Sequence, residues 1–261
     1  MPGGRGLQSG GQLTMDKLRE CYDEMVAKTG LDAEPFASVK LVEAFRRYWR
    51  PDNVQVILLA ESHVFTNDDD RARRLREETG LPGYPSNYAR FVYCLGYGED
   101  SLIAGRPPAN NPGTWQYWEL LFSCANEISC NESSAAVKKA TTSNRTRIGN
   151  KIRLLETLRE RGIWLVDASI MALYNRGKKP ATDTMEQAIK ISWRRYIGDI
   201  VAAAQPERII VIGKGVVYKT LQAELRPYQT HAIYQPNARL TSEERLENLQ
   251  TCHRLCLPDN E

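Results

Sequence analysis

The chain has 261 residues, of which 42% are hydrophobic, and its formal net charge is +3 at pH 7. A chain of this length can bury a full core, and no marked break in composition divides it. We therefore expect one domain over residues 14–261, preceded by a Gly-rich, disordered tail over residues 1–13. The mild basic excess permits a nucleic-acid partner but excludes the dense charge of a histone-like protein.

The sequence also limits where the protein works. No apolar run approaches the roughly 20 residues that span a bilayer, and the N-terminal MPGGRGLQSGGQLT lacks the apolar stretch of a signal peptide. We expect no membrane partner and a monomer inside the cell, in the cytoplasm or, in a eukaryote, in the nucleus.

Six cysteines are scattered along the chain, and no two form the CxxC pair typical of zinc sites and redox dithiols. We expect reduced structural thiols, with an iron–sulfur cluster as the alternative, and hence no metal and no cofactor. The six residues are Cys21, Cys94, Cys124, Cys130, Cys252 and Cys256.

Apolar residues at helical spacing predict two helices, over residues 15–30 and 38–51, before the first strand. Four short apolar segments are predicted strands: VQVILLA (54–60), IWLVDA (163–168), RIIVIG (208–213) and THAIYQ (230–235). Between and after them, helical patterns occupy residues 71–80, 87–98, 114–128, 151–162, 184–206, 215–225 and 241–256.

The first three strands are apolar at both alternating positions, which is typical of parallel strands covered on both faces. Strands alternating with helices indicate an α/β fold: three α/β/α layers around a short, four-stranded, mainly parallel sheet. The last helix opens with a capping-box spacing, Thr241 to Glu244. The polar, basic segment over residues 138–151 predicts a mobile loop, either a solvated linker or a phosphate-contacting loop.

Polar residues follow each predicted strand, and in open α/β sheets the ligand site lies outside these carboxyl ends. They are Glu61, Ser62 and His63; Asp167 and Ser169; Lys214 between two glycines; and Gln235, Asn237 and Arg239. The GKGVVY segment has neither the spacing of a P-loop nor the third glycine of a dinucleotide fingerprint, so a nucleotide cofactor is not expected. Ser62 is not in a GxSxG elbow, which argues against a serine hydrolase.

The order of these segments resembles the uracil-DNA glycosylase superfamily. AESHV (60–64) stands where that family has a first motif such as GQDPY or GEAPG, and QPNARL (235–240) stands where it has HPSPL or HPSPRN. Between them, TGLPGY (79–84) is similar to the TGxPFG of some members, and NYARFVYCLGYG (87–98) to a helix of the mismatch-specific branch. GIWLVDAS (162–169) occupies the place of the strand that ends in the base-reading Asn.

The resemblance implies a DNA glycosylase, acting on single- or double-stranded DNA after the target base has left the stack. Glu61 takes the catalytic position of Gln or Glu, and Ser62 that of the water-holding Asp or Asn. Because a serine is too weak a base to activate water alone, Glu61 is the better candidate. Gln235 replaces the His that stabilises the leaving base, and Asn237 replaces the Ser of the same motif.

The other implied residues bind base and backbone. Asp167 takes the base-reading place. Because an ionised Asp only accepts hydrogen bonds, Asp167 would favour two N–H donors or must be protonated, which argues against simple uracil recognition. Tyr84 or Phe65 would stack on the base, although aromatic residues beside strands are commonly core residues. Arg239 would fill the gap in DNA, and Lys214, Lys178 and Lys179 would contact phosphates.

Several alternatives stay open. Asp167 can instead cap a helix or pair with a basic residue, and Arg239 and the lysines can be solvated surface residues. The substitutions in both motifs also leave a second hypothesis, a catalytically inactive nucleic-acid or nucleotide binding protein of the same fold. A third is the hydrolysis of an unrelated small molecule in the same pocket.

Overall fold

The computed structural model describes residues 6–77, 80–128, 133–138, 143–175 and 178–257. The strands are β1 (Val56–Ala60), β2 (Ile163–Asp167), β3 (Arg208–Ile212) and β4 (Gln229–Ile233). The α-helices are α1 (Gly6–Thr29), α2 (Phe36–Tyr48), α3 (Asp68–Arg71), α4 (Trp115–Ala125), α5 (Asn144–Glu160), α6 (Thr182–Ser192), α7 (Gly198–Ala204), α8 (Val216–Thr220) and α9 (Ser242–Cys256). A π-helical turn, Trp193–Ile197, joins α6 to α7, and short 3₁₀ turns occupy Asp100–Leu102 and Ser133–Val137.

The four strands form one wholly parallel sheet in the order β2-β1-β3-β4. Every residue of β1, β2 and β3 is buried, as expected for apolar strands covered on both faces, whereas the edge strand β4 is mostly exposed or half-buried. The predicted positions of all four strands are confirmed. β1 lies in the middle of the sheet, so its carboxyl end opens between the ends of β2 and β3.

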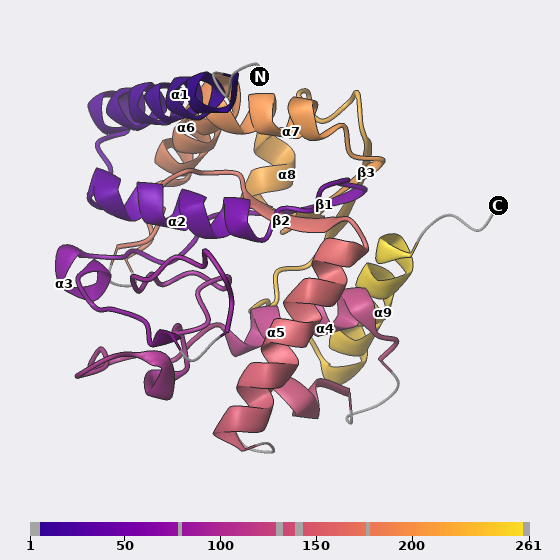
Figure 1. Ribbon diagram of the computed structural model, residues 1–261. Coiled ribbons are helices and arrows are strands. Elements are labelled where there is room, and N and C mark those ends of the chain that lie inside the picture. The colour runs from indigo at the N-terminus through magenta and orange to yellow at the C-terminus, as the bar shows by residue number, and fades with distance from the viewer. Residues whose placement is uncertain (1–5, 78–79, 129–132, 139–142, 176–177, 258–261) are drawn as a thin grey trace, which may run out of the picture.

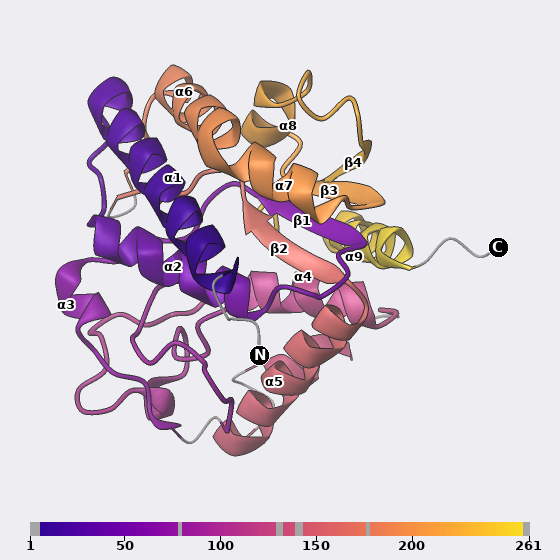
Figure 2. The same cartoon turned by 45° about the horizontal axis from the view of Figure 1, so that its top comes forward.

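Helices cover both faces of the sheet, giving three layers (Figures 1 and 2). On one face α1 packs on α6, α6 on α8, and α8 on β3; on the other α5 packs on β2, α9 on β4, and α4 lies against α5 and α9. α2 runs past the β2 edge, where Trp164 donates a hydrogen bond from Nε1 to the Arg46 carbonyl oxygen at 2.9 Å. The described helices include none with both the length and the apolar character that crossing a bilayer requires.

The N-terminal part of the chain differs from the sequence prediction. A disordered tail was expected over residues 1–13, but α1 begins at Gly6, so residues 6–13 are helical and residues 1–5 lie outside the described residues. The domain therefore includes a longer first helix than the apolar spacing alone indicates.

Two predicted helices, over residues 71–80 and 87–98, are wrong. The first is replaced beyond Arg71 by irregular chain that makes isolated bridges from Arg74 to Asn87 and from Leu75 to Ile103. The second is a run of turns in which nearly every residue is buried, so no solvent-facing side of a helix exists. Side chains instead accept hydrogen bonds from its backbone N–H groups: the Tyr84 hydroxyl accepts one from Leu95, and the Thr66 hydroxyl accepts one from Arg90.

The predicted loop over residues 138–151 is also wrong where the structure describes it from Ser143 onward. Ser143 caps the N-terminus of α5, and the first two turns of α5 follow. Two of the basic residues that made this segment look solvated are buried: Arg147 and Lys151 both bind the carboxylate of Glu99, at 2.6 Å for the closest atoms of each pair. A buried acid elsewhere in the chain neutralises them, which the local sequence cannot reveal.

The last helix is capped as predicted, and this cap can be tested. The Thr241 hydroxyl accepts a hydrogen bond from the Glu244 N–H, and the Glu244 carboxylate accepts one from the Thr241 N–H. We expect Thr241→Ala to lower the free energy of unfolding by about 1 kcal/mol, the usual cost of a lost cap. Urea denaturation measures it, with the exposed first-turn variant Ser242→Ala as the control; equal stability of the two variants would contradict a contribution from the cap.

Candidate active site

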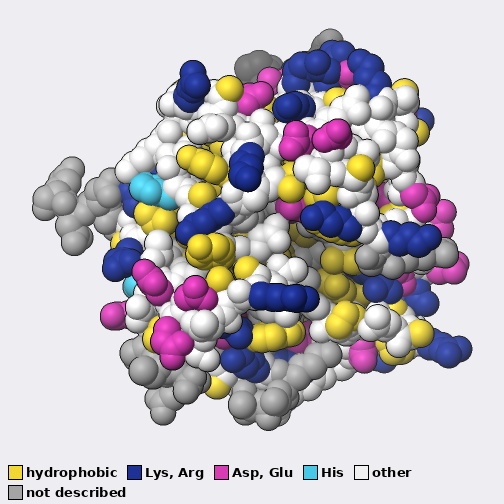
Figure 3. All heavy atoms as spheres, turned by 180° about the vertical axis from the view of Figure 1, so that it is seen from behind, with side chains coloured by type: hydrophobic (Ala, Val, Ile, Leu, Met, Phe, Trp, Pro, Cys, Tyr) yellow, Lys and Arg dark blue, Asp and Glu magenta, His cyan; other side chains and the backbone are white. Residues whose placement is uncertain are grey.

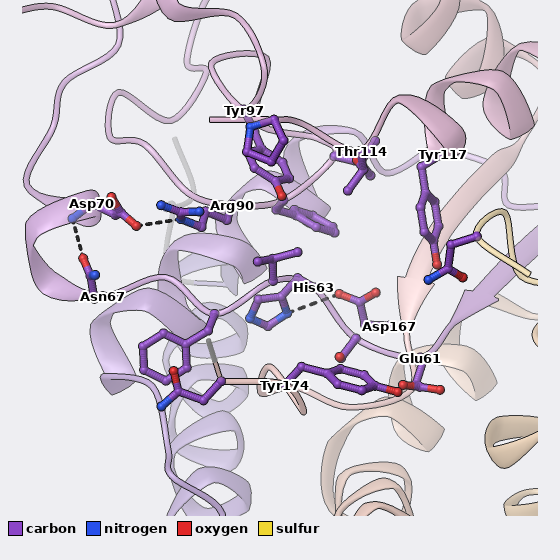
Figure 4. A pocket seen from close by; sticks show the side chains of 18 of the residues that line it. Glu61, His63, Asn67, Asp70, Arg90, Tyr97, Thr114, Tyr117, Asp167 and Tyr174 are labelled. Atoms are coloured by element: carbon purple, nitrogen blue, oxygen red, sulfur yellow. Dashed lines mark hydrogen bonds and ion pairs between the residues drawn. The ribbon is translucent and has the colours of Figure 1, made fainter. Parts of the chain in front are cut away.

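A cavity of about 820 Å³ opens at the carboxyl ends of β1 and β2 (Figure 4). Distant parts of the chain supply its wall: the loop before α2, the segment after β1, the turns around residues 90–97, the start of α4, and the loops that follow β2 and β4. Its polar and aromatic lining includes Glu61, Ser62, His63, Phe65, Asp70, Arg90, Phe91, Tyr97, Tyr117, Asp167, Tyr174, Gln235 and Asn237. The cavity therefore brings together the residues that follow three of the four strands.

Glu61 is the buried carboxylate directly after β1, and two side chains hold it. Gln235 donates a hydrogen bond from Nε2 to its Oε2 at 3.1 Å. Tyr174 bonds to the same carboxylate, and burial followed by this hydrogen bond raises the pKa of the Tyr174 hydroxyl, which therefore stays a neutral donor. The first and second motifs of the sequence thus meet through a direct side-chain contact.

Gly213, the residue after β3, makes room for this contact. Its φ is +124°, and a Cβ atom built on it would lie 3.1 Å from both Cγ and Nε2 of Gln235. Its N–H also donates to the Ile233 carbonyl oxygen at 2.9 Å, which keeps the end of β4 beside it. Only glycine adopts this backbone conformation readily and leaves the amide of Gln235 in place.

We expect Gly213→Ala to displace the Gln235 side chain and with it the orientation of Glu61. Misplacement of a positioning group by about 1 Å can cost about 100-fold in rate, and the positive φ adds roughly 1–3 kcal/mol of strain. Turnover of the substrate class proposed below and urea denaturation measure the two effects. Gly149→Ala is the control, because a Cβ at that position in α5 meets no atom within 4 Å; wild-type activity in Gly213→Ala would show that the contact is dispensable.

Asp167, at the end of β2, belongs to a buried chain of three ionisable groups. His63 Nδ1 lies 3.3 Å from Asp167 Oδ2, and His63 Nε2 lies 2.6 Å from Glu34 Oε1. Glu34, fully buried, also accepts backbone hydrogen bonds from Thr66 and Ala172 at 3.2 and 2.8 Å. The chain Glu34–His63–Asp167 ties the loop before α2 to the ends of β1 and β2.

His63 carries a positive charge between Glu34 and Asp167. Burial by itself would lower the pKa of His63, but the negative charge of Glu34 and the hydrogen bonds to Asp167 and Glu34 raise it to about 9. At neutral pH both ring nitrogens therefore donate. The Oδ2 atom of Asp167 is held by an imidazolium, and its Oδ1 has no hydrogen-bond partner among the described residues and is left for a ligand.

Ser62 lies in the cavity wall but its hydroxyl already has a partner. The Ser62 Oγ accepts a hydrogen bond from the Leu173 N–H at 3.2 Å. It thereby holds the loop after β2 that carries Tyr174, the residue that bonds Glu61. The water-holding role expected for Ser62 stays a prediction, and the structure gives it a role in fixing this loop.

The aromatic wall differs from the one expected. Phe65 is half-buried and lines the cavity, but the structure does not place Tyr84 there. The Tyr84 ring packs edge-on against Phe45 and Tyr48, and its hydroxyl donates to the Tyr93 carbonyl oxygen at 2.7 Å. Tyr84 is half-buried and packs against the core, in line with the alternative left open for aromatic residues beside strands.

Tyr117 in the first turn of α4 is an aromatic wall residue that the sequence did not single out. Burial, and after it the charges of Asp167 and Glu61, raise the pKa of the Tyr117 hydroxyl. Both carboxylates therefore act on one hydroxyl, and Figure 4 shows them between the Tyr117 and Tyr174 side chains. Glu34, Tyr117 and Tyr174 were missed because no local pattern marks them. Tyr117 and Tyr174 line the cavity from a helix start and a loop far along the chain, and Glu34 lies behind the wall and contacts His63.

The predicted DNA-binding residues lie outside the cavity wall. Arg239, Lys178 and Lys179 are exposed, and Lys214 places its Nζ 3.8 Å from the centroid of the Tyr234 ring. Asn237 is exposed at the cavity mouth. Figure 3 shows one face on which several positive side chains adjoin at the upper edge and the others are interspersed with acidic and apolar side chains.

Asp70, Asn67 and Arg90 form another part of the cavity wall. Asp70 bonds Arg90 Nε at 2.7 Å and Arg73 at 3.0 Å, and Asn67 caps the short helix α3 by accepting from the Asp70 N–H. The Arg90 guanidinium is thus oriented by a buried acid at the rim.

The amino-acid sequence matches no protein-family model, and no curated protein is significantly similar to it. The resemblance to the uracil-DNA glycosylase superfamily stays a prediction.

Proposed function

We propose that the protein hydrolyses the N-glycosidic bond between a damaged or deaminated base and deoxyribose in DNA. The observation that carries the proposal is that Glu61, Asp167 and Gln235, from three distant segments, line one cavity. Its volume of about 820 Å³ lies within the range usual for small-molecule sites and suffices for an extruded nucleotide. Aromatic rings supply apolar wall and the carboxylates supply charge.

Glu61 is suited to stabilise the sugar cation and then to take the proton of the water that reacts with it. As the bond from C1′ to the base nitrogen breaks, the electron pair leaves with the base and positive charge develops on the sugar. A water oxygen then bonds to C1′, and its proton passes to Glu61. Gln235 and Tyr174 hold Glu61 in place, and the second amide N–H of Gln235 remains for the departing base.

Asp167 defines the class of base. With His63 donating to Oδ2, the free Oδ1 only accepts hydrogen bonds. A base that presents adjacent N–H donors on its pairing edge satisfies this acceptor, whereas the two carbonyl oxygens of uracil would face a negative charge. We therefore favour purine lesions that present N–H donors on the pairing edge over uracil.

DNA would approach the cavity mouth, where Asn237 lies and Arg239 follows in the same loop. Arg239, Lys214, Lys178 and Lys179 are exposed and can reach phosphates, and Arg239 is the side chain proposed to fill the gap left by the base. A +3 net charge gives weak, salt-dependent binding that the pocket must supplement.

A cleavage assay tests the proposal. Oligonucleotides with single uracil, hypoxanthine, xanthine or alkylated bases, single- and double-stranded, are incubated with the protein, and abasic sites are cleaved with alkali and resolved on gels. We expect abasic-site formation on a purine lesion and loss of DNA affinity in Arg239→Ala with the fold intact. No abasic site on any lesion would refute the hydrolase.

The second candidate is a binding protein of the same fold without glycosylase activity. The residue at position 62 favours it, because a serine there is too weak a base to activate water alone. Lesion binding without cleavage would support it, and unchanged affinity in Arg239→Ala would count against both candidates.

A further inference from the structure

Three cysteine side chains meet in the interior between α4 and α9, away from the cavity. They are Cys124, Cys252 and Cys256, and their Sγ atoms all lie within 4.8 Å of one another. Cys252 and Cys256 are one turn apart on α9 and so share a face, and Cys124 comes from the last turns of α4. Cys124 and Cys252 are fully buried, and Cys256 is 5% exposed.

We propose that these three thiolates bind one zinc ion. Zinc held by thiolates at about 2.3 Å in a tetrahedron keeps its sulfur ligands about 3.8 Å apart. The Sγ atoms of Cys124 and Cys252 are 3.5 Å apart, and all three pairs fall within 4.8 Å, so a small inward adjustment at most completes the triangle. This site goes beyond the proposed function and does not depend on it.

The spacing distinguishes a single ion from the other products of cysteine chemistry. An iron–sulfur cluster puts several irons and sulfides between its cysteine ligands and holds them farther apart than this triangle. All three cysteines are free thiols in the structure, so no disulfide occupies the site. Soft thiolate ligands in tetrahedral array select zinc over the hard cations magnesium and calcium.

The surroundings suit three thiolates on a dication. Their sum is one negative charge, and the buried guanidinium of Arg208 lies at the same end of α9, where Nη1 donates to the Leu255 and Leu257 carbonyl oxygens at 3.0 Å. His253, next to Cys252, bonds the Ser123 carbonyl oxygen through Nδ1 at 2.9 Å, which fixes α9 against α4 beside the site.

The zinc ion would stabilise the position of α4 relative to α9, and both helices begin next to the cavity. α4 starts at the cavity, where Gln116 and Tyr117 line it, and α9 starts directly after the loop that carries Gln235 and Asn237. A bond between the far ends of these helices fixes how their near ends face each other. The metal role is therefore structural.

Metal analysis of the purified full-length chain tests the site. We expect one zinc ion per chain by inductively coupled plasma mass spectrometry. Removal of the zinc by a chelator should lower the melting temperature. Co²⁺ added to the zinc-free chain should raise the melting temperature again and give the thiolate-to-cobalt charge-transfer bands of a tetrahedral sulfur site. This arm uses the wild-type chain, so it holds even where a cysteine variant does not fold.

Variants locate the ligands. Cys124→Ser, Cys252→Ser and Cys256→Ser should each lose the zinc during gel filtration, whereas Cys21→Ala and Cys94→Ser, equally buried but outside the cluster, should retain it. Iron with acid-labile sulfide, a disulfide among the three by mass spectrometry, or failure of the apo chain to bind Co²⁺ would each overturn the proposal. So would zinc retained in all three cluster variants.

Discussion

Glu61→Gln is expected to reduce single-turnover base excision by about 10²- to 10⁴-fold, the usual contribution of a positioned general base. The substitution keeps the size of the side chain, and a neutral amide can still pair with Gln235, so the fold should persist. What disappears is the negative charge facing the sugar cation and the group that takes the proton from water. Rates on the best lesion found in the cleavage assay, at saturating protein, measure the loss.

The matched control is Asp68→Asn. Asp68 also lines the cavity, but it lies at the exposed rim and pairs with Arg71. Its loss removes the same charge without touching the carboxylate after β1, so activity close to wild type is expected. Equal loss in both variants would mean that only the overall potential of the cavity matters, and wild-type activity in Glu61→Gln would remove Glu61 from the mechanism.

The second large effect concerns stability and its pH dependence, through Glu34 and His63. The pKa of His63 is about 9 in the folded protein, above the roughly 6.5 of an unfolded histidine. The folded state therefore holds a proton that the unfolded state releases between these values. The stabilisation is complete below about pH 6.5 and is lost as the pH rises through 9, by up to about 3 kcal/mol at 1.36 kcal/mol per pKa unit.

We expect Glu34→Gln to lower the free energy of unfolding by about 3–5 kcal/mol at pH 6.5, as breaking a buried ion pair usually does. The variant should also show a much weaker decline between pH 6.5 and 9.5, because the charge that raises the pKa of His63 is gone. Urea denaturation at a series of pH values measures both effects. The exposed Glu20→Gln serves as the control, and a wild-type pH slope in Glu34→Gln would show that Glu34 does not set the charge of His63.

Chemical shifts of the His63 ring give a direct view of the same equilibrium. Glu34 from the loop before α2 and Asp167 from β2 are the charged groups that bond the ring, and Phe91 packs edge-on against it at 6.1 Å. If the His63 ring titrated near pH 6.5, His63 would not be protonated at neutral pH. The inference that Asp167 only accepts hydrogen bonds would then fail as well.

The secondary structure was predictable where one physical signal dominates. β1, β2 and β3 are found where continuous apolar runs predicted them, because a strand buried on both faces needs apolar residues at every position. The cap of α9 was equally local, since Thr241 and Glu244 satisfy each other's backbone. The helix predicted over residues 87–98 failed because its residues are buried all round and take their hydrogen-bond partners from distant side chains.

The candidate site divides in the same way. The sequence by itself determined that Glu61, Asp167 and Gln235 follow strands of a parallel sheet, and parallel strands must bring their carboxyl ends to one edge. Only the tertiary structure decided that Glu34 charges His63, that Tyr117 replaces Tyr84 as an aromatic wall, and that three scattered cysteines meet between α4 and α9. These contacts join residues far apart in the chain, and their energies depend on burial and distance, which no local pattern of residues encodes.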